Sequence, residues 1–177
     1  PNPVNPVRLV HVYRIRPVGY TSPDTHLWIY TAHLKASTGY ESQRLAECAG
    51  IRDSLNAMPA GTRAMLAGDL NFYRQSSEPG YARLLESQAN NTGRLYDLLP
   101  AGEWHDNGVF AQYHTQSPCL SGTCASGAAT GGMDDRFDFI LPTWNLVTPH
   151  GLAVIPNTYI SVGNDGQHLN KNITDAP

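Results

Sequence analysis

The chain has 177 residues, 41% of them hydrophobic, which suits one globular domain with a core of its own. A formal net charge of -3 excludes the basic surface of a non-specific nucleic-acid binder, although an enzyme acting on nucleic acid stays open. No stretch has the length and apolarity of a membrane span, and no signal peptide is visible. Because the first residue is Pro1 rather than Met, we expect a processed N-terminus or a piece of a longer protein.

The first half of the chain predicts strands that alternate with helices. Two segments alternate as strands do, and the second of them is apolar on both faces. In the long helix apolar residues recur every three or four positions, and Thr38 with Glu41 gives a capping-box signal at its start. The expected strands and helices lie at residues 7–16 (strand), 27–34 (strand), 40–58 (helix), 64–67 (strand) and 80–87 (helix).

The second half predicts strands that follow one another. We expect strands over 109–115 and 135–141, and a weaker strand over 147–156. Residues 116–132 are rich in Ser, Gly, Thr and Ala and predict a long exposed loop, and the tail from Gly163 is polar. Alternating and then consecutive strands predict α/β or α+β layers in one domain, without repeats or linkers.

Three cysteines bear on the compartment of the protein. Cys48 falls on the apolar side of the predicted helix, where a thiol behaves as a small hydrophobe. Cys119 and Cys124 flank a short Leu-Ser-Gly-Thr loop, and a disulfide between them would favour an oxidising compartment. A metal knuckle with His114 has too few ligands, and two free thiols stay open as an alternative. We therefore expect a secreted or cell-envelope location.

The most informative motif is Gly68-Asp69-Leu70-Asn71. It follows the apolar run 64–67, so its polar side chains stand at the carboxyl end of a predicted strand, where open α/β sheets place their sites. Asp69 there can hold a divalent cation or polarise a water molecule. Asn71 can donate to a phosphate oxygen without adding negative charge. A plain turn after a strand is the competing interpretation.

Two other charged or titratable positions stand on predicted strands. His33 ends the strand 27–34 and could converge with Asp69; the alternative is a core histidine bonded to a backbone carbonyl. Asp138 lies inside an apolar strand, where a charge is costly unless it is paired. Arg136, two residues earlier on the same face, could form a local ion pair with Asp138. Alternatively, Asp138 orients a catalytic histidine.

The tail offers such a histidine in Asn164-Asp165-Gly166-Gln167-His168. A polar loop that contains glycine can carry a catalytic base, and a solvated terminal loop is the alternative. Asp134 and Asp135 are expected to cap or solvate the start of the strand 135–141. The remaining histidines are expected at the surface or in packing: His11, His26, His105, His114 and His150.

Taken in order, these segments resemble the endonuclease/exonuclease/phosphatase superfamily (DNase I-like) of metal-dependent phosphoesterases. The resemblance extends from Leu27 to His168, and the order and spacing of its segments are more specific than any one of them. It implies a four-layer α/β sandwich, in which two mixed β-sheets are flanked by helices. The matching segments are His33-Leu34-Lys35-Ala36, a helix with Glu41, Arg44 and Glu47, Gly68-Asp69-Leu70-Asn71, Asp135 to Leu141, and the terminal Asp/His loop.

The resemblance also implies a chemistry: hydrolysis of phosphodiester bonds with a divalent cation, usually Mg2+, with Mn2+ or Ca2+ as alternatives. Asp69 would align or activate the attacking water and bind the metal together with Asp165. Asn71 and Arg136 would contact the substrate. In-line attack on a phosphodiester needs a positioned water and charge neutralisation, which such residues can supply.

Three more catalytic roles follow from the same resemblance. His168 would serve as the base or stabilise the pentavalent transition state, and Asp138 would orient it. His33 would act as a second acid/base or as a phosphate ligand. Histidine is the side chain best suited to exchange a proton near neutral pH.

Two departures from the family pattern matter. Family members commonly end in adjacent Ser-Asp-His, whereas Asp165 precedes His168 by three positions here. Nothing before His33 supplies the Asn motif and the metal-binding Glu of the family's first half, and Glu41 and Glu47 on a helix are poor substitutes. We therefore expect residues 1–177 to form the C-terminal portion of a larger domain, which on its own lacks a main metal ligand and one sheet's worth of strands.

Four functions follow as hypotheses. The first is a metal-dependent nuclease or other phosphodiesterase, expected to be monomeric and to act on DNA or RNA. The second is a phosphatase or a sphingomyelinase-type lipid phosphodiesterase. The third is a non-catalytic binding domain of the same fold. The fourth, a structural or adhesive secreted domain, leaves the position of Asp138 inside a strand unexplained.

Overall fold

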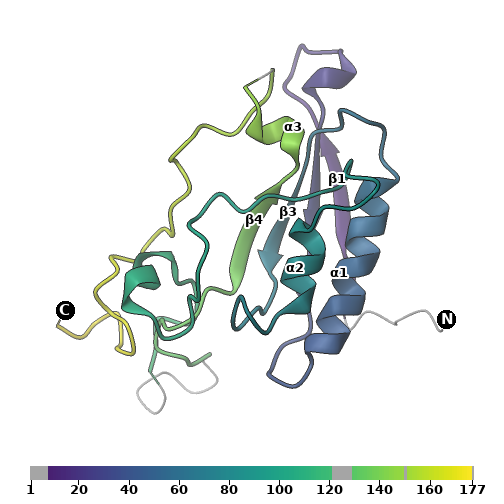
Figure 1. Ribbon diagram of the computed structural model, residues 1–177. Helices are drawn as coiled ribbons and strands as arrows, with labels where there is room; N and C mark the ends of the chain where they lie inside the picture. Colours follow the sequence, from purple (N-terminus) through teal and green to yellow (C-terminus); the bar gives the residue numbers. More distant parts are fainter. Residues whose placement is uncertain (1–7, 121–128, 150, 177) are drawn as a thin grey trace.

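The computed structural model describes residues 8–120, 129–149 and 151–176. Its centre is a four-stranded mixed sheet in the order β1-β2-β3-β4 (Figure 1). Strand β2 pairs antiparallel with β1 and parallel with β3, and β3 pairs antiparallel with β4. The expected α/β class with a mixed sheet is confirmed, and the described residues contain one sheet of the expected two. The strands are β1 (His11–Ile15), β2 (Leu27–Thr31), β3 (Ala64–Asp69) and β4 (Asp138–Pro142).

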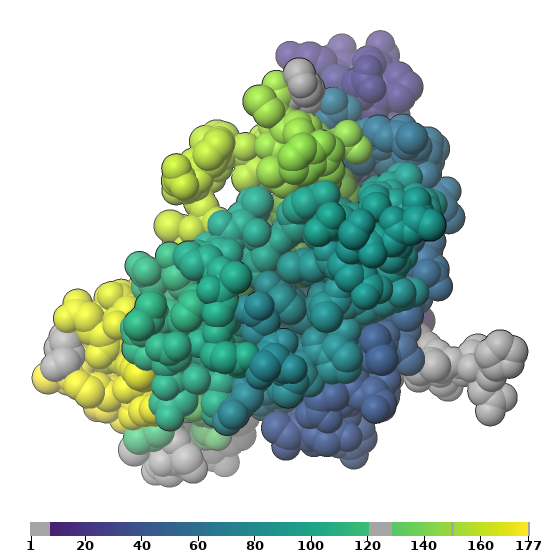
Figure 2. Space-filling model, viewed as in Figure 1, coloured from purple at the N-terminus to yellow at the C-terminus, as the bar shows by residue number. Residues whose placement is uncertain are grey.

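Two helices cover one face of this sheet. Helix α1 (Glu41–Asn56) connects the parallel strands β2 and β3, as a crossover must, and packs against α2 (Pro79–Leu85). In the space-filling view the two helices and the segment after them hide the sheet (Figure 2). Helix α3 (Trp144–Val147) follows β4, and the 3-10 helices are η1 (Pro23–Thr25) and η2 (Gly108–Tyr113). No helix in the described ranges is long and apolar enough to cross a membrane.

Two predicted strands are wrong. Residues 109–115 mostly form η2 instead, because the Asn107 side chain accepts a hydrogen bond from the Val109 N–H and starts a helical turn. Residues 147–156 contain the end of α3 and then irregular chain with no strand among the described positions. Pro149 and Pro156 lack the backbone N–H that a sheet ladder requires.

The start of α1 differs from the predicted capping box. Its N-cap is Tyr40, which makes no side-chain capping bond, so Thr38 does not play that role. Instead the Glu41 carboxylate reaches back and accepts a hydrogen bond from the Gly39 N–H at 2.9 Å. The Glu41 carboxylate still satisfies a backbone donor at the helix start, as the glutamate of a capping box would.

The core lies between the sheet and α1 and α2. Aromatic rings meet edge to face at its centre, with the Phe72 and Phe139 centroids 5.4 Å apart and Trp104 and Phe139 5.6 Å apart. Around them lie buried aliphatic side chains from every layer: Leu34, Ile51, Leu55, Leu66, Leu70, Leu84, Leu95 and Leu141. Cys48 is buried here with a free thiol, as expected.

The other face of the sheet is open in the described structure. The register places Tyr13, Ile29, Met65 and Pro142 in one row across this face, and exposed apolar side chains recur along it. Tyr13 is 53% exposed and Ile140 is 45% exposed. The sequence predicts β2 to be covered on both faces. In the structure only one face of β2 is fully covered: Tyr30 is buried, whereas Ile29 on the other face is half-buried.

The cysteine loop is described in part. Cys119 is disulfide-bonded, whereas Cys124, its expected partner, lies outside the described residues. His150 also lies outside them. The described ends of the segment 116–132 have no regular secondary structure, in agreement with the predicted loop.

A buried ion pair joins α1 to the segment before α2. The Arg44 guanidinium is fully buried and binds both carboxylate oxygens of Glu78, at 3.0 and 2.7 Å. It also donates to the carbonyl oxygens of Lys35 and Ser37, and Glu78 accepts from the Tyr73 N–H. One pair therefore fixes the loop after β2 and the loop after β3 against the same helix.

We expect Glu78→Gln to lower the free energy of unfolding by about 3–5 kcal/mol, because the buried Arg44 charge loses its bidentate carboxylate partner and keeps only the longer contact with Glu41, at 3.4 Å. Chemical denaturation measures this change. The matched control is Glu86→Gln, which removes a surface pair with Arg83 and should cost less than about 1 kcal/mol. Equal effects of the two substitutions would contradict the role given to the Arg44–Glu78 pair.

Candidate active site

Backbone pairing brings His33, Asp69 and Asp138 to one edge of the sheet. After β2 the chain stays alongside β3, since the Ala32 N–H donates to the Ala67 carbonyl and the Leu34 N–H to the Asp69 carbonyl. On the other side of β3, Asp69 is paired in register with Asp138. Alternation along the strands places Asp69 and Asp138 on the open face of the sheet, away from α1 and α2.

Gly68 allows β2 and β3 to approach closely at this point. A Cβ atom built on Gly68 would lie 2.0 Å from the Ala32 carbonyl oxygen, and the Gly68 φ angle is +143°. Both observations require glycine, because the contact is with backbone and the conformation is one that side chains rarely adopt. The glycine of the sequence motif therefore sets the position of Asp69 relative to the strand that leads to His33.

Asn71 is held tightly beside Asp69. Its φ angle is +51°, a conformation that Asn tolerates better than most residues. Its N–H donates to Asp69 Oδ1 at 3.0 Å, and its side-chain amide donates to the Leu34 carbonyl at 3.2 Å. This second bond fixes the side-chain amide of Asn71, which is buried, against the end of the β2 segment.

The electrostatics of the edge centre on Asp69. Burial raises the pKa of this carboxyl above its ordinary value, and the neighbouring Asp138 charge adds to the shift. The hydrogen bond from Asn71 and the His33 ring oppose the shift. His33 Nε2 lies 3.4 Å from Asp69 Oδ2, and both side chains are partly open to solvent. At this separation the two groups form a direct ion pair when the histidine is protonated.

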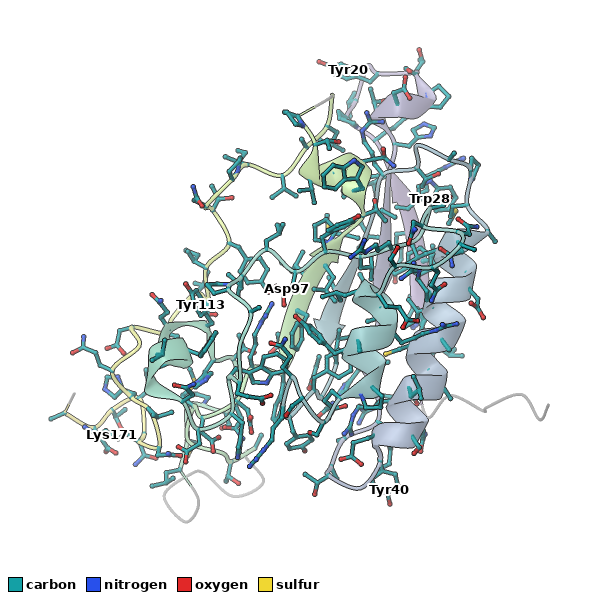
Figure 3. All side chains as sticks on the ribbon, viewed as in Figure 1. Tyr20, Trp28, Tyr40, Asp97, Tyr113 and Lys171 are labelled. Atoms are coloured by element: carbon teal, nitrogen blue, oxygen red, sulfur yellow. The ribbon has the colours of Figure 1, made fainter. Side chains whose placement is uncertain are left out.

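Asp138 is exposed, and its local ion-pair alternative is wrong. Arg136 points the other way and binds the Asp97 carboxylate at 2.7 and 3.0 Å, where it is almost fully buried. Tyr81 donates to the same carboxylate, and Figure 3 shows Asp97 near the middle of the molecule, beside β4. Arg136 therefore anchors β4 to the core, while Asp138 is held through its N–H, which donates to Thr115.

The tail places Asp165 and His168 together and away from the sheet edge. His168 Nδ1 lies 2.8 Å from Asp165 Oδ1, and Nε2 lies 2.9 Å from the Asp175 carbonyl oxygen. The Asp165 carboxylate and the Asp175 carbonyl raise the pKa of His168. Both ring nitrogens are thus occupied within the tail, which lies beyond η2 in Figures 1 and 3, where Lys171 marks it.

The expected site residues thus fall into three groups. His33, Asp69, Asn71 and Asp138 lie together at the sheet edge. Asp165 and His168 pair with each other in the tail, and no hydrogen bond joins His168 to Asp138 within the described part of the chain. Arg136 belongs to the buried Asp97 pair.

Sequence reasoning missed one cluster of metal-type ligands. Within the described ranges, His105, Asp134 and Asp135 form the one group of three or more such residues whose ligand atoms lie within 4.8 Å of one another. Asp135 was expected to be solvated but is buried. The sequence signal for this cluster is the pair of adjacent acids, Asp134 and Asp135, before an apolar strand. It does not identify their partner His105, which lies about thirty residues earlier.

No protein-family model and no curated protein matches the chain. Among solved structures, a truncated TDP2 from Caenorhabditis elegans is 16% identical with a TM-score of 0.45, over 76% of this chain and 45% of that one. Beta toxin from Staphylococcus aureus, as a mutant with bound magnesium ions, is 15% identical with a TM-score of 0.47, over 78% and 43%. A β-hairpin deletion mutant of that toxin is 14% identical with a TM-score of 0.44, over 84% of this chain and 50% of that one. The chain spans half or less of each.

We expect Asp69→Asn to raise the midpoint of thermal unfolding at pH 7. The pKa of Asp69 is higher in the folded protein than in the unfolded chain, so folding favours the protonated carboxyl. The stability that this adds is complete below the unfolded pKa of about 3.9 and is lost as the pH rises through the folded pKa. Asn removes the buried charge and keeps the oxygen that accepts from Asn71. The gain should shrink as the pH approaches about 4, and Asp53→Asn, on the exposed side of α1, is the control. A lower midpoint at pH 7 would argue against a penalised Asp69 charge.

We expect Asp165→Asn to bring the pKa of His168 down toward its ordinary value, because it weakens the largest cause of the shift. The stabilisation from protonated His168 is complete below about pH 6.5 and is lost as the pH rises through its folded pKa. An NMR titration of the histidine ring signals measures both. Asp175→Asn is the matched control, because His168 binds the Asp175 backbone rather than its side chain. An unchanged titration of His168 in Asp165→Asn would show that the pair does not form in solution.

Proposed function

We propose that this chain is part of a divalent-metal-dependent phosphoesterase that hydrolyses phosphodiester bonds, and specifically a nuclease. The observation that carries the proposal is the convergence of His33, Asp69 and Asp138 on one sheet edge from three strands. These residues come from the three separate motifs that give the sequence its resemblance to the endonuclease/exonuclease/phosphatase superfamily. Of the three side chains Asp69 is partly buried, and a carboxyl whose pKa is raised by burial beside other titratable groups is typical of a functional site.

In the proposed mechanism each residue has a role that its surroundings support. Asp69 accepts a hydrogen bond from the attacking water and aligns it, since its carboxylate is partly open beside His33. His33 takes the proton from that water, because it lies beside Asp69 and is half-exposed, and solvent protonates the leaving group on the opposite side of the phosphorus. Asn71 positions Asp69 through its N–H, while its buried side-chain amide donates to the Leu34 carbonyl and so holds the loop of Asp69 against the segment after β2.

The histidine of the tail has a smaller part in this proposal. His168 is bonded on both ring nitrogens to groups of the tail itself, so it would have to leave Asp165 and Asp175 to meet Asp138. His33 is therefore the histidine that the geometry favours for proton transfer. Asp138 is left to shape the field at Asp69, whose pKa it helps to raise.

The proposed cofactor is Mg2+, which would neutralise charge on the phosphoryl group. The residues present fit it in part: Mg2+ typically takes one or two protein carboxylates and keeps water molecules, and Asp69 with the neighbouring Asp138 could supply them. Asp165, expected as a second ligand, is bound to His168 in the tail. Asp69 and Asp138 would therefore be the only protein ligands that the described residues offer there, and water and substrate would fill the other positions.

We further propose that a second sheet, as in the sandwich that the resemblance implies, covers the open face. The support is the row of exposed apolar side chains beside the candidate site, with Tyr13, Ile15 and Ile140 each about half-exposed. Monomeric proteins rarely leave large contiguous apolar surface in water. A sheet packed there would also form the far wall of the site, since Asp69 and Asp138 lie on that face.

An oxidising compartment completes the proposal. The disulfide at Cys119 supports a secreted or envelope location, because such bonds are rare where thiols are kept reduced. We propose that the loop 116–132, part of which lies outside the described residues, sets the substrate preference.

We expect hydrolysis of plasmid DNA and bis-p-nitrophenyl phosphate that requires Mg2+ and stops on chelation. The assay compares the 177-residue chain with the protein as its gene encodes it. Asp69→Ala and His33→Ala should each lower the rate by about 100-fold or more, whereas Asp53→Ala on the exposed side of α1 should not. Activity retained in both site variants would refute the assignment, and activity on a lipid phosphodiester alone would refute the nuclease.

A further inference from the structure

A second site lies outside the residues of the proposed reaction. His105, from the segment before η2, meets Asp134 and Asp135, from the segment before β4. His105 Nδ1 lies 2.9 Å from Asp135 Oδ1, and the three ligand atoms lie within 4.8 Å of one another. Side chains from two distant segments therefore converge on one small volume.

One carboxylate oxygen of this cluster is left unsatisfied by the described residues. Asp134 Oδ1 is buried and has no hydrogen-bond partner among the described residues. Asp135 is only 3% exposed, and His105 is its one side-chain partner in that part of the chain. Burial raises the pKa of Asp135, and the Asp134 charge raises it further, against the effect of His105. An unpartnered buried carboxylate oxygen is costly, and a cation would satisfy it.

The backbone around the cluster is fixed, so the three side chains are held in place. His114 is fully buried, with Nδ1 and Nε2 each 2.7 Å from a carbonyl oxygen, those of Met133 and Trp104. It thereby ties the residue before Asp134 to the residue before His105. The Asp106 N–H donates to the Asp134 carbonyl, which closes the same connection.

Charge around the cluster also favours a cation. Asp134 and Asp135 are adjacent acids whose ligand oxygens lie within 4.8 Å of each other, so a cation between them would offset the repulsion of their charges. A hollow lined by Arg74, Ser76, Glu103, His105 and Asp106 leads to the imidazole from solvent, so an ion has a path to the cluster.

We propose that His105, Asp134 and Asp135 bind a divalent first-row transition-metal ion, with Zn2+ as the type case. One imidazole nitrogen with two carboxylate oxygens suits such ions, whereas Mg2+ and Ca2+ prefer oxygen ligands alone. The ring nitrogen that binds the metal gives up its proton to solvent. Three protein ligands leave one tetrahedral position for water.

This site is separate from the Asp69 edge and does not rest on the proposed function. The two are neighbours, because the rings of Tyr73, two residues after Asn71, and Phe137, two residues after Asp135, are in contact with centroids 4.9 Å apart. A metal at the cluster would join the segment before η2 to the start of β4, which carries Asp138. Its effect would therefore be to stabilise the frame of the candidate active site.

The test is calorimetric titration of Zn2+ into the chelator-treated full chain. We expect one equivalent to bind, and we expect His105→Gln and Asp134→Asn to weaken the affinity by more than about tenfold. Asp134→Asn keeps the side-chain shape, so it is the variant that should fold best. Asp53→Asn, on the exposed side of α1, and Asp69→Asn are the controls and should bind Zn2+ as the unchanged protein does.

NMR of the unchanged protein gives a readout that needs no variant. The ring signals of His105 should shift or broaden with one equivalent of Zn2+, and the thermal midpoint should rise. Unchanged His105 signals, absence of binding, or equal affinity in Asp134→Asn would overturn the proposal. So would loss of binding in Asp69→Asn alone, which would place the metal at the sheet edge instead.

Discussion

The buried pair between Arg44 and Glu78 is the interaction on which the arrangement of this molecule depends. A guanidinium without solvent contact is tolerated only when its donors are used, and here they reach a carboxylate and two carbonyl oxygens. Those carbonyls, of Lys35 and Ser37, belong to the loop after His33, and Glu78 also receives the N–H of Tyr73, two residues after Asn71. The helix layer thus fixes both loops that carry the candidate site, although it lies on the opposite face of the sheet.

The two faces of the sheet therefore have different tasks. One face is filled by α1, α2 and an aromatic cluster, which supply the hydrophobic stabilisation of the fold. The other carries His33, Asp69 and Asp138 together with exposed apolar side chains. Gly68 links the two tasks, because without a Cβ it lets the chain after β2 run beside β3 at Ala32, on the way to His33.

The parts of the fold that sequence reasoning predicted are those with local signals. The apolar run before Gly68, the alternation around Tyr30 and the helical spacing of Cys48, Ile51 and Leu55 each identify an element without knowledge of its partner. Long-range polar pairing has no such signal: Arg44 meets Glu78 and His105 meets Asp135 across about thirty residues. For His168 the motif implied a distant partner, Asp138, but the structure shows local ones. They are the Asp165 carboxylate, three positions away, and the Asp175 carbonyl.

Strand β1 has a consequence for how this chain behaves at high concentration. It is an edge strand of the sheet, and across 8–120, 129–149 and 151–176 no backbone partner pairs with its outer side. At the other edge strand, β4, the Ile140 N–H donates to the Tyr159 hydroxyl. An open strand border can template pairing with another chain. Arg14 and Arg16 oppose such pairing by charge repulsion, and Pro17 limits the length of strand on offer. Self-association through β1 should accordingly grow as salt screens the arginines.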